Sequence, residues 1–223
     1  MSGSSRTHEC CFITDRLKMN TNKEILKKVY SAETTEELME AYGAWAKGYD
    51  ADLADFGYRA PSESVNLFMK YVPAEAKVID VGCGTGQVGI LLAEQNFADI
   101  DGMDYSKEML EVAGEKSVYA ELFHTDITKP LNVKARKYDA LICVGTFTYG
   151  HVAGDAFERL ANIVKSGGYI VFTVREGAYD ELNYRDKMVQ MEYNKIWELK
   201  ELVDAVYFKE EEIGCKIAVY RVL

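Results

Sequence analysis

The pattern of apolar and small residues is most regular near the middle of the chain, at positions 78–86. Residues 78–81 (Val-Ile-Asp-Val) have the apolar composition of a short buried strand. Glycines follow at 82, 84 and 86, and they permit a tight turn and a close approach of a ligand to the backbone. Positions 87–95 then predict a helix. Because the N–H groups and dipole of a helix N-terminus point at such a turn, the three parts form a cradle of nucleotide size.

Strand-like and helix-like segments alternate after this turn. The strand-like segments are 78–81, 99–103, 121–124, 140–144, 169–174, 205–208 and 216–222. The helix-like segments are 87–95, 106–114, 155–165 and a broken region at 179–203. This alternation specifies a parallel sheet, whereas the last two strands lie too close for a crossover helix and should pair antiparallel. We therefore expect an α/β fold, a Rossmann-like, mostly parallel sheet of seven strands with helices on both faces and one antiparallel C-terminal strand.

Aromatic residues recur at helical spacing before the glycine turn. Thr34 and Glu37 have the spacing of a capping box, and one helix face over 34–50 then carries Leu38, Tyr42, Trp45 and Tyr49. This face either packs on the core or forms a lid over a cofactor, through ring stacking and cation–π attraction. The two roles are compatible, since they can fall on different turns.

Length and composition indicate one domain. The 223 residues are 48% apolar, which is enough for a single core. Residues 1–21 lack periodicity and are expected to be a disordered lead. Residues 22–223 are expected to form the domain, with helices at 22–72 contributing to a lid over cofactor and substrate.

Charge and cysteine content restrict the partners and the compartment. The net charge of −10, without a cluster of Lys or Arg, argues against nucleic-acid binding and favours a small-molecule partner. The five cysteines are odd in number and have no C-x-x-C spacing, so they are interpreted as reduced thiols of a cytoplasmic protein. No apolar run has the roughly 18 to 20 residues of a membrane span. We expect a monomer or a homodimer.

The glycine turn fits two cofactor signatures. Residues 84–89 also spell the dinucleotide pattern G-x-G-x-x-G, which is weak evidence alone. Asp80 discriminates between the two, because a carboxylate at the end of the strand would repel a pyrophosphate but attract a ligand with an ammonium and a sulfonium. S-adenosylmethionine is such a ligand. A glycine turn without a ligand stays the alternative.

Residues that directly follow strands are the candidates for cofactor contacts, since ligands of such sheets bind at the carboxyl ends of the strands. Asp104 lies about 20 residues beyond the central glycines, where a carboxylate can accept hydrogen bonds from both ribose hydroxyls. Its alternative role is that of a negative charge at the N-terminus of the next helix. Tyr105 can lie along the adenine. After the third strand, Asp126 can accept the adenine amine while Ile127 packs on the ring.

The loop at 145–151, after the fourth strand, should face the methyl group and its acceptor. His151 is the candidate general base, and its alternative role is to order this loop. Arg175, just past the fifth strand, can bind a substrate carboxylate or pair with a nearby acid. The expected substrate-binding side chains are Phe147, Tyr149, Arg175 and Tyr184, the last from a possible substrate cover at 179–197.

The motifs at 78–86 (Val-Ile-Asp-Val-Gly-Cys-Gly-Thr-Gly), 102–106 (Gly-Met-Asp-Tyr-Ser) and 165–168 (Lys-Ser-Gly-Gly) resemble those of the class I S-adenosylmethionine-dependent methyltransferases. The segment 42–50 and the Gly-His pair at 150–151 are similar to the methyltransferase-like proteins of the Williams–Beuren region. The resemblance implies that Asp80 and the glycine turn hold the methionine part, Asp104 the ribose and Asp126 with Ile127 the adenine. The expected cofactor-binding set is Tyr42, Trp45, Tyr49, Asp80, Gly82, Cys83, Gly84, Gly86, Asp104, Tyr105, Met109, Asp126, Ile127, Val144 and Gly145.

Two motifs found in some relatives are missing. The fourth strand lacks the Asn/Asp-Pro-Pro-Tyr segment of nucleobase methyltransferases, and no carboxylate set for a catalytic magnesium is recognisable. We therefore expect a metal-independent enzyme that moves a methyl group from S-adenosylmethionine to a small molecule, an amine or an aromatic metabolite, and releases S-adenosylhomocysteine. The first alternative is a cofactor-binding pseudoenzyme or activating subunit. The second, a reductase using NAD or a nucleotide sugar, lacks the Tyr-x-x-x-Lys pair after the fourth strand.

Overall fold

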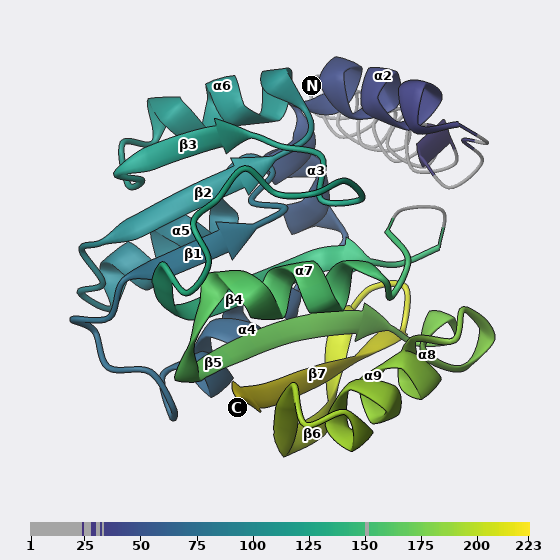
Figure 1. Ribbon diagram of the computed structural model, residues 1–223. Helices are drawn as coiled ribbons and strands as arrows, with labels where there is room; N and C mark the ends of the chain where they lie inside the picture. Colours follow the sequence, from purple (N-terminus) through teal and green to yellow (C-terminus); the bar gives the residue numbers. More distant parts are fainter. Residues whose placement is uncertain (1–23, 25–27, 30–31, 33, 150–151) are drawn as a thin grey trace, which may run out of the picture.

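A seven-stranded sheet in the order β3-β2-β1-β4-β5-β7-β6 forms the centre of the molecule (Figure 1). The structure is a computed structural model that describes residues 24, 28, 29, 32, 34–149 and 152–223. The strands are β1 (Val78–Val81), β2 (Ile100–Asp104), β3 (Glu121–His124), β4 (Tyr138–Phe147), β5 (Val164–Arg175), β6 (Trp197–Phe208) and β7 (Ile213–Val222). The helices are α2 (Thr35–Trp45), α3 (Tyr49–Asp55), α4 (Ala60–Phe68), α5 (Gln87–Glu94), α6 (Lys107–Glu115), α7 (Ala156–Ile163), α8 (Ala178–Glu181) and α9 (Tyr184–Tyr193).

The strand directions confirm the predicted topology. β1 pairs parallel with β2 and β4, and the pairs β2–β3 and β4–β5 are parallel as well. Only β7 runs against its neighbours, since it pairs antiparallel with both β5 and β6. The expected Rossmann-like α/β fold with one antiparallel C-terminal strand is therefore confirmed.

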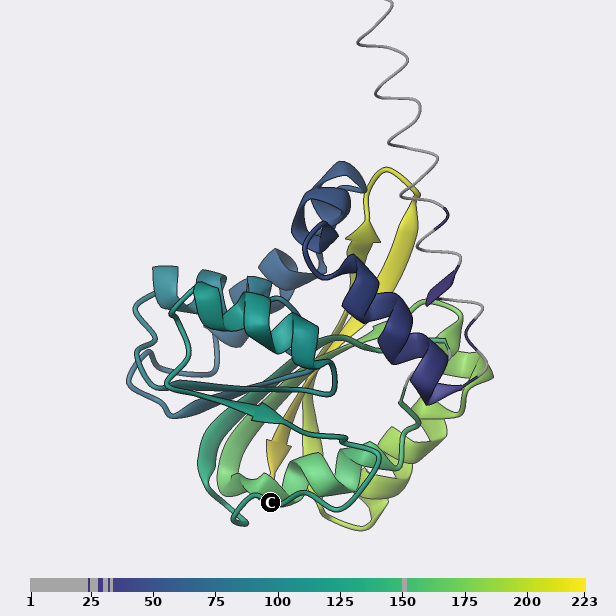
Figure 2. The ribbon, with the colours of Figure 1, turned by 90° about the horizontal axis from the view of Figure 1, so that it is seen from above.

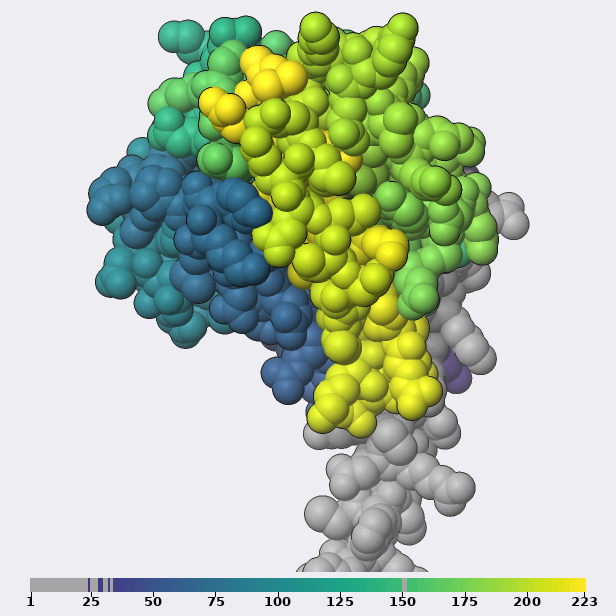
Figure 3. All heavy atoms as spheres, turned by 90° about the horizontal axis from the view of Figure 1, so that it is seen from below, coloured from purple at the N-terminus to yellow at the C-terminus, as the bar shows by residue number. Residues whose placement is uncertain are grey.

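The start of β6 differs from the prediction. The broken helical region expected at 179–203 ends at Tyr193, and β6 already begins at Trp197. This strand forms one edge of the sheet and leaves Leu199 and Leu202 exposed, so its first half lacks the continuous apolar run of a buried strand. In Figure 3 the C-terminal strands form the yellow strip between the blue N-terminal half and the green segment of α8 and α9.

Two apolar cores cover the two faces of the sheet, because successive residues of a strand point to opposite sides. Val78 of β1 packs into a core shared with α2 to α5, whereas its neighbour Ile79 packs into a core shared with α7, α8 and α9. The second core contains a close stack of Trp197 on Tyr220, with ring centroids 4.1 Å apart. Both faces are thus covered by helices, as a parallel sheet requires.

The N-terminal aromatic segment forms two helices, where a single one was predicted. Thr34 caps α2 as expected, because its hydroxyl accepts a hydrogen bond from the Glu37 backbone N–H at 3.2 Å. The helix ends at Trp45, and α3 begins at Tyr49 after Gly48. Figure 2 shows α2 beside α6, whereas α3 lies next to the turn between β6 and β7.

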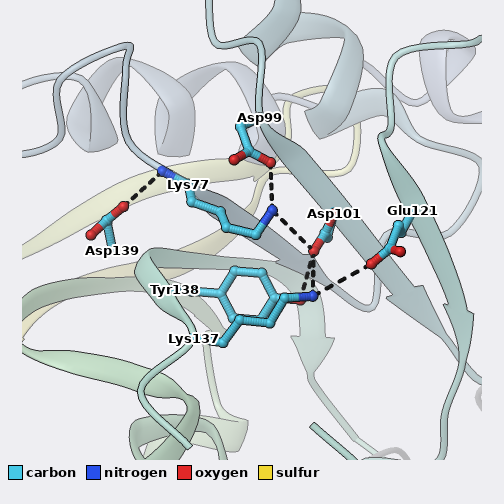
Figure 4. A network of polar contacts seen from close by, with 7 residues as sticks. All are labelled: Lys77, Asp99, Asp101, Glu121, Lys137, Tyr138 and Asp139. Carbon is cyan, nitrogen blue, oxygen red and sulfur yellow. Dashed lines mark hydrogen bonds and ion pairs between the residues drawn. The ribbon is translucent and has the colours of Figure 1, made fainter. Parts of the chain in front are cut away.

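A network of charged side chains lies at the amino ends of β1 to β4 (Figure 4). Asp101 lies at its centre and is fully buried. One of its carboxylate oxygens lies 2.9 Å from Lys137 Nζ and 3.6 Å from Lys77 Nζ, and it accepts a hydrogen bond from the Tyr138 hydroxyl. These contacts fix the amino ends of the strands in register and leave the carboxyl ends for binding.

Candidate functional site

A pocket opens at the carboxyl ends of β1, β2 and β4, where the sheet order reverses between β1 and β4. It holds about 850 Å³ of space outside the protein atoms, part of it open to solvent. Most of the expected cofactor-binding residues line it, namely Tyr42, Tyr49, Gly82, Gly84, Asp104, Tyr105, Met109, Asp126, Ile127, Val144 and Gly145. Sequence segments more than 100 residues apart therefore meet in one recess, as the strand-end argument predicts.

The glycine turn forms the floor of this pocket. Gly82 and Gly84 have φ values of 67° and 53°, which other residues rarely adopt. A side chain at Gly82 would collide with Thr146, since an added Cβ would lie 2.1 Å from its hydroxyl oxygen. An added Cβ at Gly84 would have no protein atom within 4 Å. The backbone at Gly84 thus faces open space that a ligand can fill.

Asp104 ends β2 and braces this turn. One carboxylate oxygen accepts a hydrogen bond from the Gly84 N–H and the other from the Ser106 N–H, each at 2.8 Å. Burial raises the pKa of Asp104, while the backbone N–H donors, led by Ser106, lower it in part. The two bonds leave each oxygen with acceptor capacity toward the pocket that Asp104 lines.

Asp80 lies below the turn, only 1% exposed, and does not line the pocket. Its Oδ2 accepts a hydrogen bond from the Tyr119 hydroxyl at 2.7 Å. Its Oδ1 is buried and has no hydrogen-bond partner in the described part of the chain. Burial raises the pKa of Asp80 to about 7, and the nearby Asp104 carboxylate adds to this shift. The carboxylate is thus poorly compensated where a cationic ligand would stabilise its charge.

The side chains after β3 form the far wall of the pocket. Asp126 accepts hydrogen bonds from the N–H of Thr128 at 2.9 Å and from its hydroxyl at 2.5 Å. Burial raises the pKa of Asp126, but these bonds and the Lys129 ammonium outweigh burial and lower it overall. Beside Asp126, Ile127 is 7% exposed and lines the pocket. This wall offers an ionised acceptor next to an apolar surface, which suits the amine and the ring of an adenine.

The aromatic segment divides between the two roles considered for it. Tyr42 and Tyr49 line the pocket. Trp45 is 3% exposed and belongs to the core, where its Nε1 donates a hydrogen bond to Asp52 at 2.7 Å. Trp45 therefore supports the two tyrosines rather than facing the pocket.

Two residues that the sequence analysis did not single out hold this site together. Asp50, the second residue of α3, accepts hydrogen bonds from the Thr85 hydroxyl at 2.5 Å and from Gln87 Nε2 at 2.9 Å, and it pairs with Lys116 Nζ at 2.5 Å. Tyr119 is the second, through its bond to Asp80. The sequence signal for Asp50 was its place at the end of the 42–50 segment, directly after Tyr49, and for Tyr119 there was none.

Cys83 and Gly86 lie beside the main pocket rather than in it. Gly86 has a φ of 92° and caps the N-terminus of α5. Cys83 lines a smaller adjoining pocket with Tyr58, and this pocket shares Tyr49 and Val144 with the main one. Burial raises the pKa of the Cys83 thiol well above its usual value, so the sulfur is a neutral wall group.

The structure does not bring the expected substrate-binding residues together. Phe147 and Tyr184 are 0% and 1% exposed and pack in the core around Phe157, so they are not available to a substrate in this conformation. Their positions were misjudged because aromatic residues after a strand fit a core as well as a pocket. The Tyr149 ring lies 5.7 Å from the Arg175 guanidinium, and its hydroxyl donates a hydrogen bond to Glu181. His151 lies outside the described residues.

No group of three or more His, Cys, Asp or Glu side chains within the described residues is arranged to hold a metal ion. Within the same residues, no helix has both the length and the apolar character to cross a membrane.

Comparison with known proteins agrees with this geometry. A family described as "Methyltransferase domain" matches residues 78–168. Human methyltransferase-like protein 27 is 30% identical over 186 residues, which are 78% of this chain and 75% of that protein. The dTDP-3-amino-3,6-dideoxy-alpha-D-glucopyranose N,N-dimethyltransferase of Streptomyces fradiae is 29% identical over 145 residues, 63% of this chain and 54% of that enzyme. A TehB-like S-adenosylmethionine-dependent methyltransferase from Corynebacterium glutamicum has the same fold, with a TM-score of 0.61 over 81% of this chain and 99% of that one, at 16% identity.

The chain belongs to the S-adenosylmethionine-dependent methyltransferases. The expected resemblance to the methyltransferase-like proteins is confirmed through the human relative. The pocket fits the cofactor of this family on three observations, namely the open backbone at Gly84, the Asp104 carboxylate in the wall and the unpartnered oxygen of Asp80. S-adenosylmethionine is therefore the cofactor, and S-adenosylhomocysteine is the product derived from it.

Proposed function

We propose that this methyltransferase acts on a small-molecule acceptor, an amine or an aromatic metabolite. The observation that carries the proposal is that the cofactor recess and the aromatic side chains of Tyr42 and Tyr49 form one pocket. Its lining carries carboxylates and, among the residues that the structure describes, no Lys or Arg. Acidic and aromatic walls favour a neutral or cationic acceptor through cation–π contact. One similar enzyme supports a small substrate by its name, the amino-sugar N,N-dimethyltransferase of Streptomyces fradiae.

Transfer of a methyl group from a sulfonium is an in-line displacement, and S-adenosylmethionine supplies that methyl group when bound. The chain's own contribution is alignment of the two reactants and exclusion of water. The paired helices α2 and α3 cover the pocket for this purpose, with Tyr42 and Tyr49 on its surface.

The proposed cofactor contacts follow the walls of the pocket. Asp104 accepts hydrogen bonds from the ribose hydroxyls. Asp126 accepts a hydrogen bond from the adenine amine, while Ile127 packs against the adenine ring. Asp80 and the glycine turn hold the methionine part. The support for these assignments is that Asp104, Asp126 and Ile127 line one pocket together with Gly82 and Gly84, and that Asp80 lies two residues before Gly82 in the sequence.

A general base is required only when the acceptor arrives protonated. His151 remains the candidate on sequence grounds. Arg175 and Tyr149 remain candidates for binding a substrate carboxylate or ring, supported by the proximity of their side chains.

We also propose a cytoplasmic protein that is monomeric or dimeric. The three cysteines within the described residues, Cys83, Cys143 and Cys215, are free and buried, which suits a reducing compartment. Sedimentation of the purified protein would determine its oligomeric state.

The test of the proposed function is a screen of small-molecule acceptors with S-adenosylmethionine that carries a deuterated methyl group. Mass spectrometry should find one or more amines or aromatic metabolites that gain the labelled methyl. Tight cofactor binding with no labelled product across a broad panel would instead support a cofactor-binding pseudoenzyme or activating subunit.

A further inference from the structure

The carboxylate of Asp80 has a hydrogen-bond environment that is unusual for a buried charged group. Its carboxylate is almost completely buried. The Tyr119 hydroxyl donates a hydrogen bond to Oδ2 and the Gly89 backbone N–H also faces the carboxylate, whereas Oδ1 has no hydrogen-bond partner in the described part of the chain. Among the described residues no cationic side chain forms an ion pair with Asp80, and the titratable groups that face it are Tyr119, Asp104, Cys83 and Cys143. A buried carboxylate in such surroundings lacks a positive partner.

Tyr119 reaches Asp80 from the segment between α6 and β3, 39 residues away in sequence. Its ring fills the space left by three glycines. Added Cβ atoms at Gly86, Gly89 and Gly102 would lie 3.0, 2.4 and 3.0 Å from its ring carbons. The ring is therefore wedged between the start of α5 and β2, and this packing fixes where the hydroxyl points.

The hydrogen bond has a directional consequence for Asp80. Because Tyr119 occupies Oδ2, the rotation of the carboxylate is fixed and Oδ1 is the oxygen left for another donor. A cofactor with an ammonium at the end of its amino-acid part supplies such a donor together with the missing positive charge.

We propose that Tyr119 is a positioning residue for cofactor binding, which orients Asp80 so that Oδ1 receives the ammonium of the amino-acid part. The proposal rests on the assignment of Asp80 to the methionine part of the cofactor. Tyr119 itself contacts the glycine turn and Asp80, and it acts on the ligand only through them.

The test compares two ligands by titration calorimetry. S-adenosylhomocysteine carries the ammonium, whereas 5′-methylthioadenosine has the same nucleoside without the amino-acid part. Tyr119→Phe keeps the wedged ring and removes only the hydroxyl. We expect it to weaken S-adenosylhomocysteine binding by about tenfold and to change methylthioadenosine binding by less than about twofold, as loss of a charged hydrogen-bond network predicts.

Asp80→Asn provides a second, nearly isosteric variant with the same expected split between the two ligands. Tyr119→Phe in the Asp80→Asn background should have little further effect, because the two residues act as a unit. Tyr71→Phe serves as the matched control, since it removes a tyrosine hydroxyl that bonds another carboxylate, that of Glu201, outside the cofactor pocket.

An equal loss for both ligands, or no loss for either, would overturn the role of Tyr119 while leaving the cofactor assignment intact. A wild-type protein that binds neither ligand would overturn both. The split between the ligands also separates positioning from packing, because a loosened core would weaken the two ligands alike.

Discussion

The carboxylate of Asp50 accepts a hydrogen bond from the Thr85 hydroxyl at 2.5 Å, and this contact ties α3 to the glycine turn. The same carboxylate pairs with Lys116 at the end of α6. Desolvation raises the pKa of Asp50, but the hydrogen bonds from Lys116, Thr85 and Gln87 lower it overall, so it is ionised at neutral pH. The Asp50 side chain thus connects α3 to two elements of the cofactor site, the glycine turn and the end of α6.

Asp50→Ala should loosen the packing of α2 and α3 against the cofactor pocket. We expect S-adenosylhomocysteine to bind about tenfold more weakly, which corresponds to about 1.5 kcal/mol for a lost charged hydrogen bond. Limited proteolysis between α2 and α4 should become faster. Asp55→Ala, at the exposed end of α3, is the control and should leave both measurements unchanged. Equal affinity in the two variants would remove Asp50 from cofactor binding.

Asp104→Ala should weaken cofactor binding by about 1 to 3 kcal/mol, since it removes a charged acceptor and the brace on the Gly84 N–H. Both S-adenosylhomocysteine and methylthioadenosine should lose affinity, because both carry the ribose. Calorimetry with each ligand checks this. Affinities equal to those of the wild type would rule out the ribose assignment.

Asp80 makes cofactor binding depend on pH. Its pKa of about 7 in the folded protein lies above the 3.8 of an ordinary aspartate, so it is largely neutral below pH 7 and ionised above it. The affinity for S-adenosylhomocysteine should therefore rise between pH 6 and 8, and the rise should disappear in Asp80→Asn. A wild-type affinity that falls or stays flat over this range would contradict the assignment.

The same shift has the opposite consequence for the stability of the ligand-free protein. Because folding raises the pKa of Asp80, its contribution favours the folded state below about pH 4 and is lost as the pH rises through 7. Urea unfolding at several pH values should show that Asp80→Asn gains stability relative to the wild type toward pH 8. An unchanged difference between pH 5 and 8 would argue against a raised pKa.

The network around Asp101 should matter for stability and not for binding. Lys137→Met removes the nearer of the two ammonium groups and leaves Asp101 buried with Lys77 at 3.6 Å. We expect a loss of about 2 kcal/mol in the free energy of unfolding, by urea titration, with cofactor affinity unchanged. Lys165→Met, which breaks a more exposed pair with Asp139, should cost less than about 1 kcal/mol. Equal losses in the two variants would contradict a central role for Asp101.

Local sequence patterns predicted the elements that build the cofactor pocket. The strand before the glycine turn was predicted at its observed bounds, and so was β3, because both are short runs bounded by clear turn signals. Asp104 and Asp126 were placed at the pocket because the carboxyl ends of parallel strands meet at one edge. These inferences need only periodicity and topology.

Contacts between distant segments could not be predicted in the same way. The hydrogen bonds from Thr85 to Asp50 and from Tyr119 to Asp80 span 35 and 39 residues. Thr85 and Asp80 belong to the motif at 78–86, but no local pattern pairs them with Asp50 and Tyr119. Phe147 was expected at the substrate because the fourth strand was predicted to end at residue 144 and a loop to follow at 145–151. The strand β4 instead continues through Phe147 and carries its ring into the core. The first half of β6 was missed because an edge strand tolerates exposed leucines.

The cofactor is tested most directly by a calorimetric titration of the purified protein with S-adenosylmethionine and, separately, with NAD. We expect measurable affinity for S-adenosylmethionine and none for NAD, because the unpaired carboxylate of Asp80 beside the glycine turn favours a cation over a pyrophosphate. Binding of NAD without binding of S-adenosylmethionine would contradict this expectation.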